Sequence, residues 1–191
     1  MPGSFDQPSH PVLEPSPWVR RFGHLIAPGS TVLDVACGHG RHTRWARAAG
    51  HPVVAVDIDV SGIADLADDP GVETVARDLE ATDWPFTGRA FGAVIVANYL
   101  DRARFDAWCA GLAPGGVLLV DTFGAGNEGF GRPRNPAFLL APGELLKAFG
   151  QRLQVVAYEA GIEATPRPAV RQRLCAVRDT APLPLVPRAG G

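Results

Sequence analysis

Short apolar runs alternate with segments of helical pattern through the first 150 residues, and this alternation restricts the fold more than any other feature. The runs with the length and apolar content of buried strands are 31–36, 52–57, 72–78, 91–98 and 115–123. The segments expected to be helical are 17–26, 40–50, 61–66, 101–112 and 142–150, and Ser16, Ser61 and Asp101 are expected to cap the first, third and fourth of them. Strands that are joined through helices run parallel within one sheet. The pattern therefore predicts an α/β fold with a doubly wound, mostly parallel sheet and helices on both faces.

The last part of the chain follows a different pattern. Residues 153–160 and 170–178 are strand-like, and the segment between them contains Gly161, Pro166 and Pro168. No helix fits into that segment, so the two runs are expected to pair antiparallel. Together with the five runs before them they predict a seven-stranded sheet with an antiparallel last strand.

Composition sets the expected organisation and partners. We expect a single domain over residues 16–179, between a flexible N-terminal segment, 1–15, and a loose C-terminal tail, 180–191. A net charge of −2 and a pI near 6.2 argue against nucleic acid as a partner. We expect no membrane partner, because no apolar run reaches the roughly 18–20 residues that a bilayer requires. Three widely spaced cysteines and no signal-peptide pattern indicate a cytoplasmic protein. We expect it to be a monomer or a homodimer.

The stretch VLDVACGHGRH, residues 32–42, joins the first predicted strand to the next helix. Gly38 and Gly40 lack the side chains that would keep another molecule away from the backbone. A dinucleotide would require G-x-G-x-x-G, but Thr43 stands where the third glycine belongs, and shifting the frame to begin at Ala36 puts Arg41 there. The alternative is a tight strand-to-helix turn that binds nothing.

The pattern Asp34-x-Ala36-x-Gly38-x-Gly40 resembles the first motif of the Rossmann-like, class I S-adenosylmethionine-dependent methyltransferases. The family's usual form is acid-x-Gly-x-Gly-x-Gly, so the chain departs from it at Ala36 with another small residue. The resemblance spans residues 16–178, and the stretches from Asp34 to Asp59 and FLLAPGELL are most similar to the small tellurite-resistance-type methyltransferases.

Two further acids end consecutive predicted strands, Asp57 the second and Asp78 the third. An acid at the first position can accept the ribose hydroxyls of an adenosine, a role for which Asp59 competes. The resemblance implies that Asp78 accepts from the adenine amino group and that Leu79 offers its backbone amide to the ring. The alternative for each acid is that it is a solvated residue at the end of a strand and binds no ligand. The implied cofactor-binding residues are Asp34, Ala36, Cys37, Gly38, Gly40, Asp57, Ile58, Asp78, Leu79 and Asn98.

Candidate acceptor-binding residues come from two places. The resemblance puts Asn98 and Tyr99 beside the methionine end of the cofactor and the acceptor, although Tyr99 is equally expected as a packed aromatic. The long linker 124–142 follows the fifth strand, so we expect a lid in which Arg132 and Arg134 bind an anionic acceptor. The alternative is that both arginines are solvated.

The remaining motifs carry no predicted chemistry. Trp84-Pro85-Phe86 is interpreted as packing. His39 and His42 have no metal-ligand partners at useful spacing, so no metal site is predicted and solvated or capping roles are expected for both.

The leading prediction is an S-adenosylmethionine-dependent methyltransferase that acts on a small-molecule acceptor and releases S-adenosylhomocysteine. Alignment and exclusion of water are the main requirements of methyl transfer, and a general base is needed only for a protonated acceptor. No catalytic residue is therefore predicted. The alternative is a non-catalytic module that binds S-adenosylmethionine or S-adenosylhomocysteine. A nicotinamide oxidoreductase is disfavoured because the dinucleotide motif fails.

Overall fold

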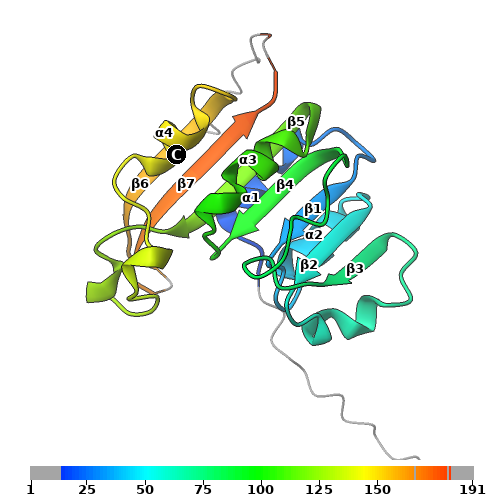
Figure 1. The fold of residues 1–191 in the computed structure, drawn as a ribbon, viewed down its shortest axis with the longest axis horizontal. Helices are drawn as coiled ribbons and strands as arrows, with labels where there is room; N and C mark the ends of the chain where they lie inside the picture. Colours follow the sequence, from blue (N-terminus) through cyan, green and yellow to red (C-terminus); the bar gives the residue numbers. More distant parts are fainter. Residues whose placement is uncertain (1–13, 166, 180, 182–191) are drawn as a thin grey trace, which may run out of the picture.

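A single seven-stranded sheet forms the centre of the protein, as the computed structural model shows for residues 14–165, 167–179 and 181 (Figure 1). Its strands are β1 (Val32–Val35), β2 (Val53–Asp57), β3 (Val72–Ala76), β4 (Phe91–Ala97), β5 (Leu112–Phe123), β6 (Gln154–Glu163) and β7 (Ala169–Val177). The α-helices are α1 (Pro17–Phe22), α2 (Arg41–Ala48), α3 (Phe105–Ala110) and α4 (Glu144–Phe149). Short 3₁₀ turns are η1 (Gly23–Leu25), η2 (Ser61–Leu66), η3 (Arg102–Arg104), η4 (Asn127–Gly129) and η5 (Pro136–Phe138).

The strand order is β3-β2-β1-β4-β5-β7-β6, and β1 to β5 run parallel. β7 runs antiparallel to both of its neighbours, β5 and β6. The predicted doubly wound sheet and its antiparallel last strand are therefore confirmed. The order of strands reverses between β1 and β4, and in open α/β sheets ligands bind at this switch, beyond the carboxyl ends of the strands.

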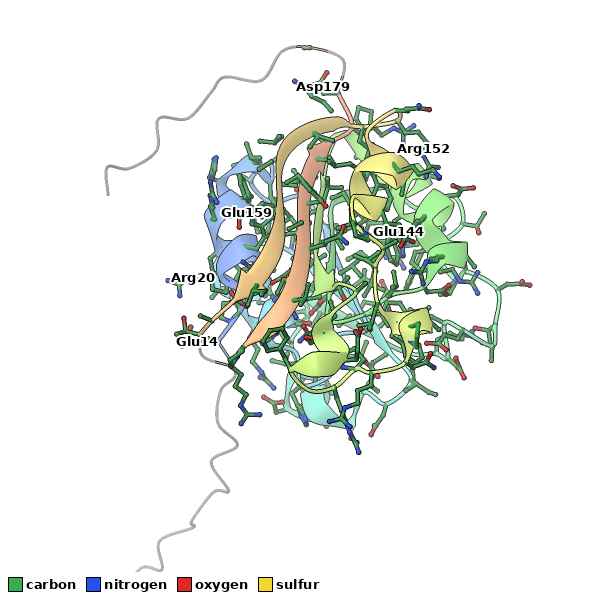
Figure 2. All side chains as sticks on the ribbon, turned by 90° about the vertical axis from the view of Figure 1, so that its left-hand side faces the viewer. Glu14, Arg20, Glu144, Arg152, Glu159 and Asp179 are labelled. Atoms are coloured by element: carbon green, nitrogen blue, oxygen red, sulfur yellow. The ribbon has the colours of Figure 1, made fainter. Side chains whose placement is uncertain are left out.

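Alternate residues of the strands enter two separate cores, one on each face of the sheet. On one face, Leu33 and Val35 pack with Trp108 of α3 and Phe149 of α4. On the other, Val32 packs with the core that contains Trp18, Val19 and Phe22 of α1 and Ala46 of α2. Figure 2 views the sheet from its β6 edge, with α1 on one side and α3 and α4 on the other. Burial on both faces explains why the parallel strands read as continuous apolar runs.

Two predicted caps begin helices as expected. The Ser16 side chain accepts from the Trp18 amide ahead of Pro17, which starts α1. The Asp101 side chain accepts from the Ala103 amide and starts η3, which leads into α3.

Other local predictions need correction. Ser61 does not cap a helix: residues 61–66 form kinked 3₁₀ turns whose N-cap is Val60. The third strand ends at Ala76 rather than at residue 78, so Asp78 lies in the loop that follows. Glu14 and residue 15 are described although they belong to the predicted flexible segment 1–15. The rest of that segment and nearly all of the tail 180–191 lie outside the described residues.

Candidate functional site

The loop between β1 and α2 has a backbone that few residue types adopt. Ala36, Gly38 and Gly40 have φ angles of 52°, 54° and 71°, all in the left-handed region. A Cβ at Gly40 would lie 2.3 Å from Cγ2 of Ile63, so η2 packs directly on this glycine. A Cβ at Gly38 would meet no atom of the described residues within 4 Å. The loop is thus packed on one side at Gly40 and open at Gly38.

Asp57 ties the end of β2 to this loop. Its Oδ2 accepts from the Gly38 amide at 2.8 Å, and its Oδ1 accepts from the Asp59 amide at 3.1 Å. Asp59 in turn accepts from the Ser61 amide. Each carboxylate oxygen of Asp57 retains a lone pair for a further donor. Of the two candidates for a ribose-binding acid, Asp57 is the one that contacts the glycine-rich loop.

Asp34 lies beneath the loop rather than on its surface. The residue is 1% exposed, and its Oδ2 accepts from the Thr43 hydroxyl at 2.7 Å. Burial raises the pKa of the carboxyl to about 6, against the opposing effect of the Thr43 hydrogen bonds. The bond to Thr43 joins the end of β1 to the first turn of α2, so this acid supports the loop from inside. The sequence prediction of a loop acid facing the ligand did not anticipate this burial.

The predicted adenine-binding residues lie beside β2, because β3 pairs with it. Asp78 accepts from the amides of Glu80 and Ala81 through Oδ1, which orders the loop after β3. Leu79 is buried, and Ile58, which directly follows β2, has 68% of its side chain exposed. An exposed aliphatic surface beside an ordered acidic loop suits a flat ring with a polar edge.

Two further predicted residues take packed positions. Cys37 is 6% exposed, and burial raises the pKa of its thiol. Tyr99 packs against the core on the α3 face, and its hydroxyl is buried without a hydrogen-bond partner among the described residues. Burial, followed by the nearby charges of Asp101 and Glu80, raises the pKa of this phenol. The neighbours of Tyr99 thus put it on the β3 side of the switch point, beside the residues that are predicted to bind adenine.

Asn98, which precedes Tyr99, is exposed and has a left-handed φ of 57°.

A buried polar cluster at the carboxyl ends of β4 and β5 was missed by the sequence analysis. Asp121 accepts from Arg171 at 2.7 Å, from Arg173 at 3.0 Å and from the Ser16 hydroxyl at 2.5 Å. Arg171 also donates to Oδ1 of Asn98 at 2.8 Å. The charges of the two arginines and the Ser16 bond hold the pKa of Asp121 below its usual range despite the burial. The alternating arginines within the apolar strand 170–178 were the available signal.

His42 belongs to the same region. It is 3% exposed, so of the two roles expected for it, solvated or capping, the solvated one is wrong. Its Nε2 accepts from the Ser16 amide at 3.1 Å, which requires a neutral ring with the proton on Nδ1. Burial, reinforced by the Arg41 charge, lowers the pKa of His42 to about 3. The ring thus joins α2 to the start of α1 as a neutral group.

The linker 124–142 is fastened at several points. Gly124 forms a β-bridge with Leu140, and the Gln172 side chain donates to the carbonyls of Leu140 and Ala141. Asn127, which is 1% exposed, accepts from the Val170 amide and donates to the Pro133 carbonyl. Arg102 donates to the carbonyl of Ala137 in η5 and to the carbonyl of Leu139, the C-cap of η5. Arg102 also donates to the carboxylate of Glu144, which Figure 2 shows on the α4 side of the sheet.

The exposed part of this linker carries Arg132 and Arg134. Neither arginine forms an ion pair within the described part of the chain. Figure 1 shows the linker at the same end of the sheet as η2. The contacts described above fix its two ends, and between them the Pro133 carbonyl accepts from Asn127.

Two kinds of feature are absent from the described residues. Within them, no group of three or more His, Cys, Asp or Glu side chains is arranged to hold a metal ion. None of the helices there has the length and apolar character to cross a bilayer.

Comparison with known proteins identifies the domain type. Residues 32–116 match the family model of a methyltransferase domain. TehB from Haemophilus influenzae has a similar structure, with a TM-score of 0.69 and 18% identity over 84% of this chain and 61% of TehB. This chain therefore spans less than two thirds of the TehB chain. Comparison with curated proteins finds no match.

Two other solved structures were determined with S-adenosylhomocysteine. The 1,6-didemethyltoxoflavin-N1-methyltransferase of Burkholderia thailandensis has a TM-score of 0.61 and 21% identity, over 83% of this chain and 74% of its own. The glycopeptide N-methyltransferase MtfA has a TM-score of 0.57 and 21% identity, over 84% of this chain and 88% of its own. At these identities the similarity establishes a shared fold.

Proposed function

Because this chain belongs to the Rossmann-like, class I methyltransferases, we propose that it binds S-adenosylmethionine and transfers its methyl group to a small-molecule acceptor. The predicted family is confirmed by the match of residues 32–116 and by the fold. The acceptor and the roles of individual residues are our inference.

The observation that carries the proposal is the open side of the glycine-rich loop. The loop lies at the switch point between β1 and β4, where a doubly wound sheet binds its ligand. Within the described part of the chain, no atom lies within 4 Å of the position that a Cβ at Gly38 would take, although Gly40 two residues later is tightly packed. A ligand that needs close approach to the backbone fits at Gly38, and the bond from its amide to Asp57 fixes that surface.

The ribose and the adenine of the cofactor each have suitable partners. Asp57 offers carboxylate oxygens to the ribose hydroxyls, Ile58 offers an exposed aliphatic face to the adenine, and the loop of Asp78 and Leu79 offers polar groups to the edge of the ring. We assign Asp34 a supporting role, because its carboxylate is enclosed with Thr43.

The cofactor supplies an electrophilic methyl group on a sulfonium centre. The protein's contribution is to align the acceptor and exclude water. Asn98 lies at the carboxyl end of β4, beside the switch point, and is our candidate for the boundary between cofactor and acceptor. Arg132 and Arg134 lie on the exposed part of the linker 124–142, from which they would reach an anionic acceptor.

A small molecule is the acceptor class that we favour. The Burkholderia enzyme of similar fold has 1,6-didemethyltoxoflavin bound, which is a small molecule. All three cysteines are unpaired, which fits a reducing cytoplasm.

Calorimetric titration tests the cofactor assignment. We expect S-adenosylmethionine and S-adenosylhomocysteine to bind with dissociation constants of about 1–100 μM, or roughly 5–8 kcal/mol. Tight binding of NADH with no binding of either of them would refute the proposal. Release of S-adenosylhomocysteine in the presence of an acceptor would distinguish an enzyme from a binding module.

A further inference from the structure

The strand β6 forms one edge of the sheet (Figure 1). Among the described residues it pairs only with β7, so one row of its backbone groups faces away from the sheet. Such a row is a template for the addition of a further strand. The bonds of β7 identify which residues of β6 contribute to this row.

Backbone groups of β7 alternate between its two neighbours, as in any antiparallel strand. The Val170 carbonyl accepts from the amide of Gly124, which directly follows β5. At the other end of β7, the Arg178 amide donates to the Gly116 carbonyl of β5. Even-numbered residues of β7 therefore bond toward β5, and odd-numbered residues bond toward β6.

The odd-numbered residues of β7 stand in register with four residues of β6, namely Ala157, Glu159, Gly161 and Glu163. These four bond inward, so the amides and carbonyls of the residues between them point outward. The outward row consists of Tyr158, Ala160 and Ile162. No other backbone group of the chain that the structure describes bonds to this row.

The outward row lacks the usual protection of an edge strand, which is a lysine, a proline or a bulge. The bulge in β6 lies between Val155 and Ala157, and from there to Glu163 the register with β7 is regular. Residues 157–163 contain no lysine and no proline. Ile162 in this segment is 67% exposed, although it is apolar. The segment is therefore open to another strand.

The two acids of this segment are paired within their own chain. Glu159 forms an ion pair with Arg21 of α1 at 2.7 Å. Arg173 of β7 pairs with both Glu159 and Glu163. Unpaired carboxylates would repel a second copy of the same strand, but these two carry arginine partners.

We propose that two copies of the chain form a homodimer in which their β6 strands pair antiparallel about a two-fold axis at Ala160. The two seven-stranded sheets then continue into each other across the interface. A two-fold axis brings the same surface of both copies together, so an antiparallel strand is able to pair with itself. This inference does not depend on the proposed function, because three strands separate β6 from β1.

The axis at Ala160 uses the whole regular segment. Ala160 is the central residue of 157–163, so every residue of that segment then has a partner. Tyr158 packs on the α4 face of the sheet, and in this register it opposes Ile162 of the partner subunit. Aromatic and β-branched side chains that oppose each other in this way stabilise a pair of strands.

Like charges are not directly opposed in this register. Glu159 opposes Gly161 of the partner subunit, and Glu163 opposes Ala157 of the partner subunit. Moving the axis by one residue, to Glu159 or to Gly161, would set two glutamates directly opposite each other, which is destabilising. Moving it to Tyr158 would pair residues across the bulge. This self-complementary register favours a second copy over a strand of another protein.

Gly161 also leaves space for the residue that opposes it. Residues 158–163 line a hollow of about 480 Å³ together with Arg171 and Arg173. A Cβ at Gly161 would meet no atom of the described chain within 4 Å. The side chain of Glu159 of the partner subunit therefore has room at this position.

Sedimentation equilibrium of the full chain over a range of concentrations tests for the dimer. We expect a mass that approaches twice the 20.2 kDa of one chain as the concentration rises. Hydrogen exchange should slow with concentration at the amides of Tyr158, Ala160 and Ile162. The amides of Ala157, Glu159 and Gly161 should be protected at every concentration, because they bond to β7.

Ala160→Pro removes an outward amide that takes no part in the ladder with β7. A proline is tolerated at such a position of an edge strand, so the fold should be kept, as an unchanged circular dichroism spectrum would show. We expect the dissociation constant of the dimer to rise about tenfold or more, since two hydrogen bonds are lost across the axis. Ala160→Ser retains the amide and should dimerise as the wild type does.

Covalent capture with oxidised glutathione tests the register. Opposed residues of a hydrogen-bonded pair lie about 5.5 Å apart at Cα, within reach of a disulfide, so Ala160→Cys should form a covalent dimer. Ile162→Cys is the matched control, because the two copies of this exposed residue would be offset by about 13 Å along the strands. The wild-type chain measures the background from its own three cysteines.

Each outcome bears on the inference. A wild-type chain that remains a monomer at every concentration would refute it. If Ala160→Pro dimerises as tightly as the wild type, or if Ile162→Cys cross-links as readily as Ala160→Cys, the two copies meet elsewhere and the inference is overturned. If Ala160→Pro does not fold, the comparison of the two cysteine variants decides.

Discussion

The carboxylate of Asp57 accepts a hydrogen bond from the backbone amide of Gly38 at 2.8 Å, and this contact joins the end of β2 to the loop that follows β1. The two residues are 19 positions apart in the sequence. The same carboxylate is our ribose-binding candidate, so it would shape the loop and bind the ligand.

Asp57→Ala should therefore weaken cofactor binding through both roles. We expect a loss of about 1.5–3 kcal/mol in the binding of S-adenosylhomocysteine, as is typical for removal of a charged hydrogen-bond acceptor. Asp59→Ala is the matched control, because Asp59 accepts from the Ser61 amide and has no contact with Gly38. Calorimetry of both variants decides the assignment: a larger loss in the Asp59 variant would transfer the ribose role to that acid.

Two glycines of the loop should respond differently to a side chain. At Gly38 a Cβ enters open space, so Gly38→Val should abolish cofactor binding and cost about 1–2 kcal/mol of stability through the left-handed backbone. At Gly40 a Cβ overlaps Ile63. Gly40→Ala should therefore lower the free energy of unfolding by about 1–3 kcal/mol through crowding, in addition to the cost of its own left-handed backbone. Urea unfolding measures the stabilities, and normal ligand binding by Gly38→Val would show that the cofactor does not approach this turn.

The double variant Gly40→Ala/Ile63→Ala tests the cause of the second effect. Removing Cγ2 of Ile63 eliminates the overlap, so the two substitutions should be less destabilising together than the sum of their separate effects. Simple additivity would mean that the backbone conformation alone accounts for the cost at Gly40.

His42 should make the folded state less stable in acid. Its pKa is about 3 in the folded protein against an ordinary value of 6.5, so between these pH values the unfolded chain binds the proton more readily. Stability should therefore fall as the pH decreases through this window, by at most about 1.4 kcal/mol per pH unit. Asp34 acts in the opposite direction between about pH 6 and pH 4, because its folded-state pKa of about 6 lies above the usual value of 3.8.

His42→Gln isolates the histidine contribution. A glutamine oxygen can accept from the Ser16 amide as Nε2 does, but it does not titrate. We expect the stability of this variant relative to the wild type to increase as the pH falls from 6.5 to 4 in urea unfolding experiments. Parallel stability curves for the two proteins would show that His42 is already accessible to protons in the folded state.

The linker 124–142 should move only between its anchors. Hydrogen exchange should be slow at the amides of Ala125 and Leu140, which donate to the backbone carbonyls of Leu140 and Phe123. It should be fast at the amides around Arg132 and Arg134. Arg132→Ala/Arg134→Ala should leave the affinity for S-adenosylhomocysteine within about twofold and lower turnover with the true acceptor. Full activity of the double variant, with equal exchange in free and ligand-bound protein, would leave both arginines as surface residues.

The sequence alone predicted the class of fold and the place of the loop, because both depend on local patterns. Apolar runs of strand length separated by helical segments require a parallel sheet, and a pair of glycines after the first strand identifies the turn at its carboxyl end. Ser16 and Asp101 were recognisable as caps because capping involves neighbours two or three residues away. The acids after β2 and β3 were found for the same reason, since each directly or closely follows an apolar run.

Only the tertiary structure decided what each polar side chain faces. Asp34 lies within β1 and Asp57 ends β2, but the carboxylate of Asp34 is enclosed with Thr43, whereas Asp57 reaches the glycine-rich loop. Arg171 meets Asp121 across 50 positions of sequence and Asn98 across 73, because the strand order brings β7 beside β5 and β5 beside β4. Periodicity along the chain carries no information on which strands become neighbours. Burial and charge pairing depend on those neighbours, and so they appear only once the sheet is assembled.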